Sequence, residues 1–128
     1  MRKATPASAK RRAWQSFAKY IRDRDPECIT CGKPTAHAGH FFHTTDKEGT
    51  KTLGGNEIWY EERNVHGQCA PCNLYKSGNQ IVYTLYVQRR YGINAVQELQ
   101  KLFNTPRKYT VDELLAVEEL YKRKLNGI

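Results

Sequence analysis

The chain has 128 residues, of which 21 are lysine or arginine and 13 are aspartate or glutamate, so its formal net charge is +8. This length is typical of one domain, and such an excess of positive charge indicates a polyanionic partner, most commonly nucleic acid. No apolar stretch is long enough to span a bilayer, and the basic first residues lack the hydrophobic segment of a secretory signal. We therefore expect a cytoplasmic protein with no membrane contact.

The chain begins with a polar stretch that is followed by a helical pattern. Residues 1–9 are small and polar, and we expect them to form a disordered basic arm. Between residues 10 and 25, apolar side chains recur at the spacing i, i+3, i+4 and i+7, which is typical of a helix with one buried face. These side chains are Trp14, Phe17, Ala18 and Ile21. Pro26 is expected to end the helix just before the first pair of cysteines.

Two Cys-x-x-Cys pairs, Cys28 with Cys31 and Cys69 with Cys72, contain all the cysteines of the chain. In a reducing cytoplasm such pairs are more often metal ligands than disulfides. Two tight turns of this kind complete the four thiolates of a tetrahedral zinc site, which has no open position and is therefore structural. Four buried free thiols would not explain the repeated spacing. A redox pair would need a thioredoxin-like strand–helix–strand pattern, which neither pair has around it.

Two aromatic-rich stretches between the cysteine pairs, residues 36–43 and 56–62, are expected to be short strands. The segment that joins them is rich in glycine, threonine and charged residues, which is typical of a hairpin loop. A helix is expected to begin within the sequence CAPCNLYK and to end near Ser77 and Gly78.

Further helices are expected in the last third of the chain. The stretch QIVYTLYVQRRYG is apolar nearly all round, so its periodicity does not separate helix from strand, but Gly92 as a stop favours helix. Thr110 and Glu113 form a T-x-x-E capping box that marks the start of the last helix. The helix between these two is expected to place on one side Ile93, Val96, Leu99 and Phe103.

All four histidines lie between the two cysteine pairs, and three of them fall within the stretch HAGHFFH. The order of the polar side chains is His40, Asn64 and then Asn73, directly after the second cysteine pair. Hydrolysis of a phosphodiester needs a water molecule that loses a proton near neutral pH, and imidazole is suited to accept it. An amide oxygen such as that of Asn73 binds hard cations such as Mg²⁺ or Mn²⁺. Taken singly, each side chain also fits a packed histidine or an ordinary loop or cap residue.

The order of CxxC, HAGH, N-x8-N and a second CxxC just before the last asparagine resembles the HNH endonucleases of the ββα-metal (His-Me finger) class in their zinc-clipped form. Together with AWQSFAKYIRDRD, QCAPCN and SGN, residues 10–103 are similar to the NinG (Rap) family of phage recombination proteins. The resemblance implies an α+β fold with a ββα-metal core, an N-terminal helix and additional C-terminal helices. It also implies a metal-dependent endonuclease that acts on branched DNA, such as Holliday junctions, in the host cytoplasm.

By the same resemblance, His40 is the general base and Asn64 holds its ring or the surrounding loop in register. Asn73 binds a catalytic Mg²⁺ or Mn²⁺, and we expect His40 to face it across a gap the size of a phosphate group. Many family members carry an aspartate directly before the base histidine, where this chain has Gly39. Because His37 projects on the same side of a strand as residue 39, we expect it to supply the missing ligand. An imidazole ligand favours Mn²⁺, Zn²⁺ or Ni²⁺ over Mg²⁺.

We therefore expect a single domain over residues 10–128, with the N-terminal helix at 10–25, the zinc-clipped core at 26–78 and a helical region at 79–128. Basic side chains should contact the DNA backbone with strong salt dependence and little base specificity. Lys76 follows Asn73 by three residues and emerges on nearly the same helical face. The other expected contacts are Arg63, Arg89, Arg90, Arg12, Lys19 and Arg22.

Three questions stay open at the level of sequence. A junction has two strands to cut, which favours a C2 homodimer, but the apolar helices after Gly78 would equally complete a monomer core. The chain also fits a non-catalytic zinc module that binds DNA or recruits partners, in which His40 has no role. A sequence-specific HNH homing or restriction nuclease is a third possibility, although the chain has no obvious separate reading domain.

Overall fold

The computed structural model describes residues 4–45, 51–52, 55–76 and 78–127. Its helices and small sheets make it a mixed α/β structure, as the sequence predicts at this level. None of the helices in these ranges has the length and apolar character that crossing a membrane requires. The elements are α1 (Pro6–Arg24), β1 (His37–His40), β2 (Thr44–Thr45), β3 (Lys51–Thr52), the 3₁₀ turn η1 (Glu62–Asn64), β4 (Val65–Gln68), the π-helical turn η2 (Pro71–Tyr75), α2 (Gln80–Tyr91), α3 (Ala95–Phe103) and α4 (Val111–Leu125).

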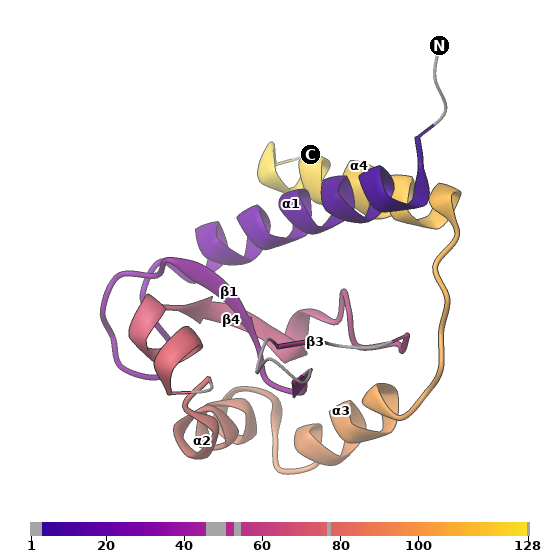
Figure 1. Ribbon diagram of the computed structural model, residues 1–128. Helices are drawn as coiled ribbons and strands as arrows, with labels where there is room; N and C mark the ends of the chain where they lie inside the picture. The colour runs from indigo at the N-terminus through magenta and orange to yellow at the C-terminus, as the bar shows by residue number, and fades with distance from the viewer. Residues whose placement is uncertain (1–3, 46–50, 53–54, 77, 128) are drawn as a thin grey trace.

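An antiparallel pair of strands, β1 and β4, lies at the centre of the molecule (Figure 1). Its register places His37 opposite Gln68 and His40 opposite Val65. Because side chains alternate along a strand, the two faces of this sheet carry different residues. One face carries His37, Gly39, His66 and Gln68, and the other carries Ala38, His40, Val65 and Gly67.

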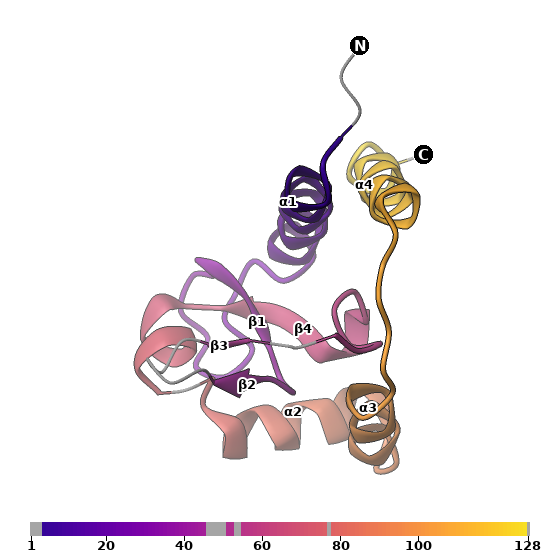
Figure 2. The same cartoon turned by 45° about the vertical axis from the view of Figure 1, so that its right-hand side comes forward.

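Each face of the sheet is covered by a different helix (Figure 2). Val65 packs with Phe17 of α1, which belongs to the buried stripe that the periodicity predicts. On the other side, the hydroxyl group of Tyr83 in α2 hydrogen-bonds to the ring of His66 and to the backbone carbonyl of Gly39. We therefore call the two sides of the sheet the α1 face and the α2 face.

Helix α1 begins at Pro6, four residues earlier than the sequence predicts, so the prediction of an arm at residues 1–9 is wrong for its second half. Thr5 and Ser8 form a reciprocal capping box, in which each side-chain oxygen accepts the other residue's backbone N–H. Proline suits the first helical position because the N–H it lacks has no partner there. The sequence does not predict this capping box because its third helical position holds serine, where glutamate or glutamine is usual. Residues 1–3 lie outside the described ranges.

The second strand of the central sheet is β4, so the prediction of a strand at residues 56–62 is wrong. The Asn56 Oδ1 atom accepts the backbone N–H of Ile58 at 3.1 Å, which closes a turn. The apolar side chains that suggested a strand instead pack in the core, where Ile58 is fully buried. All four residues of β4 are buried because helices cover both faces, yet its sequence VHGQ is short and has only one large apolar side chain, so it lacks the apolar run expected of a strand buried on both faces.

Helices α2 and α3 follow where the sequence predicts them, and Gly92, with a φ of +100°, separates them. Tyr83, Val87 and Leu99 from these helices pack with Phe41 in the core on this side of the molecule. Ile93 does not belong to α3, because it precedes the helix and is 74% exposed. The helical region at 79–128 therefore has two separate parts: α2 and α3 pack with Phe41, whereas α4 packs against α1.

Helix α4 returns to α1 after the segment 104–110, which runs from α3 along one side of the molecule (Figures 1 and 2). The capping box predicted at its start is confirmed, because Thr110 Oγ1 accepts the N–H of Glu113 at 3.1 Å and the Glu113 carboxylate accepts the N–H of Thr110 at 3.0 Å. Leu114 of α4 packs against Ala13 of α1.

Candidate functional site

The four cysteines gather at one point, as their spacing predicts. Their Sγ atoms all lie within 4.8 Å of one another, and the Sγ atoms of Cys31 and Cys69 are 3.4 Å apart. Zinc–sulfur bonds of about 2.3 Å in a tetrahedral site place neighbouring sulfur atoms about 3.8 Å apart. The donor set is four thiols with no disulfide among them. The cluster therefore fits one shared zinc ion.

The first cysteine pair is folded as a tight turn that favours the thiolate of Cys28. The N–H of Cys28 donates to the carbonyl of Lys33 at 2.6 Å, and the N–H of Gly32, with a φ of +83°, donates back to the carbonyl of Cys28 at 2.8 Å. Burial raises the pKa of the Cys28 thiol, but hydrogen bonds from Thr30 and from backbone amides outweigh it and lower this pKa to about 6. The thiolate is the form that binds zinc.

The second cysteine pair places Asn73 beside β1. The N–H of Asn73 donates to the carbonyl of Cys69 at 3.0 Å, and the N–H of Gly78 donates to the carbonyl of Cys72 at 2.9 Å. The Asn73 side chain is only 9% exposed. A Cβ atom on residue 39 would lie 2.9 Å from Asn73 Oδ1, closer than side chains pack, so a larger residue here would require the neighbouring amide side chains to move.

Gln68 lies at the same place, and the sequence alone predicts no role for it although it begins the QCAPCN motif. Its side chain is fully buried, and its Nε2 donates to the carbonyl of Gly78 at 2.8 Å and to Thr30 Oγ1 at 3.3 Å. Its Oε1 points at Gly39, where it would overlap a Cβ atom. Among the described residues this oxygen has no hydrogen-bond partner. Two amide oxygens, from Gln68 and Asn73, therefore converge over Gly39.

His37 is half-buried and lies on the α2 face together with Gly39. It stands directly opposite Gln68 in the register, and opposed residues of an antiparallel pair have Cα atoms about 4.5–5.5 Å apart. The register therefore brings His37 beside Gln68, on the face where the two amide oxygens converge.

His40 is the last residue of β1 and projects to the α1 face. Its ring stacks on Trp14, with the ring centroids 4.9 Å apart and the planes inclined by 21°, and Trp59 meets it edge-on at 6.3 Å. Its Nε2 atom is buried. The prediction that His40 faces Asn73 across a gap is wrong, because neighbouring residues of a strand project to opposite faces. The Cα atoms of His40 and Gly39 are nevertheless only about 3.8 Å apart.

Asn64 is fully buried and holds the chain directly after β1. Its Oδ1 accepts the N–H of Phe42 at 2.7 Å, and its Nδ2 donates to the carbonyl of the same residue at 3.2 Å. Its backbone carbonyl accepts the N–H of Phe41 at 2.7 Å. The amide therefore holds the loop that follows His40. From the sequence, we expect Asn64 to hold either the His40 ring or the surrounding loop, and these contacts are to the loop.

Two further side chains fix β1 from the α2 face. The Tyr83 hydroxyl donates its only proton to the carbonyl of Gly39 at 2.7 Å, so it accepts a hydrogen bond from Nδ1 of His66, 2.9 Å away. The Nε2 atom of His66 then accepts from the Tyr91 hydroxyl at 2.7 Å. Burial, followed by the charge of Arg24, lowers the pKa of His66 to about 3, so this ring stays neutral.

Nearly the whole sequence matches a known family. A sequence model described as bacteriophage lambda NinG protein matches residues 3–128. The chain belongs to the NinG family. Proteins named NinG from Escherichia phage 933W, Escherichia phage lambda and Salmonella phage P22 are 34%, 33% and 33% identical to it over 123 residues. These matches cover 92% of this chain but only 56–57% of the relatives, so the chain spans little more than half of their length. No solved structure matches it.

The cations expected to contact DNA in this NinG family member differ in how far their charges are already paired. Arg63 forms ion pairs with two glutamates at 2.9 and 2.5 Å, and Arg12 pairs with Glu118 at 2.8 Å. Arg90 lies 3.6 Å from the carboxylate of Asp25. The expected contacts that are exposed and form no ion pair with any described residue are Lys19, Arg22, Lys76 and Arg89. A phosphate group therefore has the freest access to this second set.

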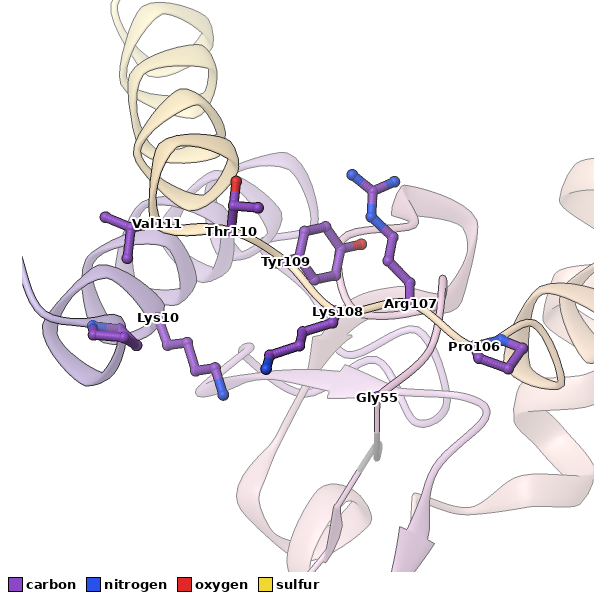
Figure 3. A pocket seen from close by; sticks show the side chains of 9 residues that line it. Lys10, Gly55, Pro106, Arg107, Lys108, Tyr109, Thr110 and Val111 are labelled. Carbon is purple, nitrogen blue, oxygen red and sulfur yellow. The ribbon is translucent and has the colours of Figure 1, made fainter.

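A separate basic pocket of about 670 Å³ opens in the same NinG family member, between the start of α1 and the segment before α4 (Figure 3). Lys10 and Lys108 extend toward one another across it in this view, and the ring of Tyr109 lies beside them. Its lining residues come from α1, from Gly55 and from residues 106–111, so it is distinct from the amide cluster. Cations beside an aromatic ring are the contacts that single-stranded nucleic acid uses.

Proposed function

We propose that this member of the NinG family is a metal-dependent DNA endonuclease with an HNH (ββα-metal) centre that cleaves branched recombination intermediates such as Holliday junctions. One observation carries the proposal. The cysteine cluster holds the amide oxygen of Asn73 over Gly39, one residue from a histidine at the end of a clamped strand. The order of β1, β4 and η2 along the chain agrees with a strand–strand–helix core of this class.

Each polar side chain has a separate role in this proposal. His40 accepts the proton of the attacking water, and Asn64 keeps the end of β1 in place through the backbone of Phe42. Asn73 and His37 would bind a Mg²⁺ or Mn²⁺ ion, which supplies positive charge that stabilises the leaving oxygen. The scissile phosphodiester would lie across the end of β1, because the imidazole and the amide oxygens are on opposite faces of that strand.

The positive charge supports a nucleic-acid substrate, and the exposed cations that form no ion pair with a described residue support contacts to its backbone. The preference for branched DNA comes from the resemblance to recombination proteins. A four-way junction has two strands to cut, so a C2 dimer would place one centre on each of them. Because the chain spans little more than half of the related NinG proteins, these substrates and the dimer are proposals.

A second function, a zinc module that binds DNA without cutting it, is favoured by one contact. His40 is stacked on Trp14 with its Nε2 atom buried, which is the environment of a packed histidine. In a binding module this ring only fills space. In a nuclease it must leave Trp14 far enough for Nε2 to reach water.

Cleavage of labelled DNA distinguishes the two functions. We expect the zinc-loaded chain to cut a four-way junction in Mg²⁺ or Mn²⁺ in preference to a flap or a linear duplex, and to cut nothing after chelation. His40→Ala should abolish cleavage while junction binding in EDTA is retained, because the general base is lost and the cations remain. His43→Ala, which removes a nearby histidine, is the matched control and should still cleave. A chain that cuts none of the substrates with either metal supports the binding module.

A further inference from the structure

We infer that Gln68 is a ligand of the divalent cation, with its Oε1 binding beside Oδ1 of Asn73. The inference deepens the proposed function and rests on it for the use of the cation. It is carried by the geometry of one buried side chain, which begins the QCAPCN motif but to which the resemblance assigns no role.

The orientation of the Gln68 amide is fixed. Its Nε2 lies 2.8 Å from the carbonyl oxygen of Gly78, which can only accept a hydrogen bond. A flipped amide would bring two acceptors into contact there, so Nε2 must face Gly78 and Oε1 must face Gly39.

The Oε1 atom of Gln68 therefore needs a partner that is not part of the described polypeptide. The side chain is fully buried, and this oxygen has no hydrogen-bond partner among the described residues. Buried polar atoms without a partner are rare because they have lost water without replacing it. Asn73 Oδ1 lies 2.9 Å from the point that a Cβ on Gly39 would occupy, and Gln68 Oε1 lies closer still. Both oxygens therefore face the space over Gly39, where a positive group would be stabilised by the two of them.

A divalent cation would supply the partner that Gln68 Oε1 lacks among the described residues, and Asn73 Oδ1 lies close enough to share it. Cations of this kind bind oxygen ligands at about 2.0–2.6 Å, so two ligands on one ion converge as these amides do. Gln68 would then occupy the space that an acidic side chain on residue 39 would need, which explains how the chain can carry Gly39. With His37 opposite Gln68, the ligands are two amides and an imidazole, and none of them carries a charge. Such a set leaves the full double charge of the ion for the phosphate, and its imidazole favours Mn²⁺ over Mg²⁺.

Binding of Mn²⁺ to the zinc-loaded full chain tests the inference without any cleavage assay. Free Mn²⁺ is counted by electron paramagnetic resonance while zinc content and thermal unfolding are recorded for each variant. Gln68→Met should weaken Mn²⁺ binding on the order of tenfold or more, because a ligand is lost. Gln68→Glu should bind at least as tightly as the natural chain, because it keeps the oxygen and adds a charge. Asn56→Leu removes a buried amide elsewhere and should bind Mn²⁺ normally.

An exchange of ligands between two positions excludes a merely structural role. Gly39→Asp alone should weaken Mn²⁺ binding, because the new side chain overlaps Gln68. Combined with Gln68→Ala it should restore binding, because the carboxylate then takes the vacated place. Equal Mn²⁺ affinity in the natural chain and Gln68→Met, weaker binding by Gln68→Glu, or no restoration in the double variant would overturn the inference and leave the nuclease proposal intact. No Mn²⁺ binding by the natural chain would contradict the catalytic cation itself.

Discussion

At the scale of single residues, the polar atoms around β1 are held by uncharged side chains. Asn64 clamps the backbone of Phe42, and the neutral ring of His66 acts through Tyr83 on the carbonyl of Gly39. Uncharged groups can be buried at lower cost than ions, provided that their hydrogen bonds are satisfied. The contacts that Asn64 and His66 make at the strand end therefore do not depend on a charge on either side chain.

His66 gives the chain a specific dependence of stability on pH. Its pKa is about 3 in the folded chain because of burial, against an ordinary value of 6.5, so below pH 6.5 the unfolded chain takes up a proton that the folded chain does not. This part of the stability is complete above pH 6.5 and is lost as the pH falls toward 3, by up to about 1.4 kcal/mol per pH unit. We expect His66→Gln to lack this component.

Urea unfolding at a series of pH values measures this effect of His66. Zinc release in acid weakens both chains, so the difference between their free energies of unfolding isolates the histidine. The natural chain should lose its advantage over His66→Gln as the pH falls below 6.5. Parallel curves for the two chains would show that the ring is not held neutral.

At the scale of elements, prediction from sequence succeeds where the determinants are local. The capping box at Thr110 and the apolar stripe that includes Phe17 are each read within a few residues, and both helices form. Strand β4 was missed because helices from distant parts of the chain bury both of its faces. Gln68 was missed for the same reason, since only the fold brings its amide to Gly39. For His66, the available indication in the sequence was the pair Tyr83 and Tyr91, which lie eight residues apart in α2 and both hydrogen-bond to its ring.

The cysteine cluster joins the turn at Cys28 and Cys31 to the chain between β4 and η2, so the placement of Asn73 should depend on zinc. Removal of zinc with a strong chelator should release one zinc ion per chain, because four thiols form a single cluster. The stripped chain should lose cooperative unfolding, since structural zinc contributes roughly 10–16 kcal/mol of apparent binding free energy in small domains. Metal analysis and thermal unfolding monitored by circular dichroism measure both effects. A chain that contains no zinc and unfolds identically after chelation would contradict this role.

At the scale of the whole molecule, the strand end lies between two helical layers. Helices α1 and α4 lie on one side of the β1–β4 sheet, and α2 lies on the other (Figure 2). His40 projects toward the first layer and Asn73 approaches from the second. The +8 charge and the pocket at Lys10 and Lys108 extend the surface available to a polyanion beyond the strand end. In the proposed function, a long nucleic acid would contact the chain at several places while one phosphodiester meets β1.

The central claim is that the strand end at Gly39 and His40 is a site of phosphodiester hydrolysis organised around the amide oxygen of Asn73. Its most direct test is the single-turnover rate of junction cleavage in Mn²⁺ by the natural chain and by Asn73→Ala, with junction affinity in EDTA measured in parallel. We predict that the rate falls by about 100-fold or more while the affinity in EDTA is unchanged. Equal rates in the two chains, or no cleavage by the natural chain, would contradict the claim.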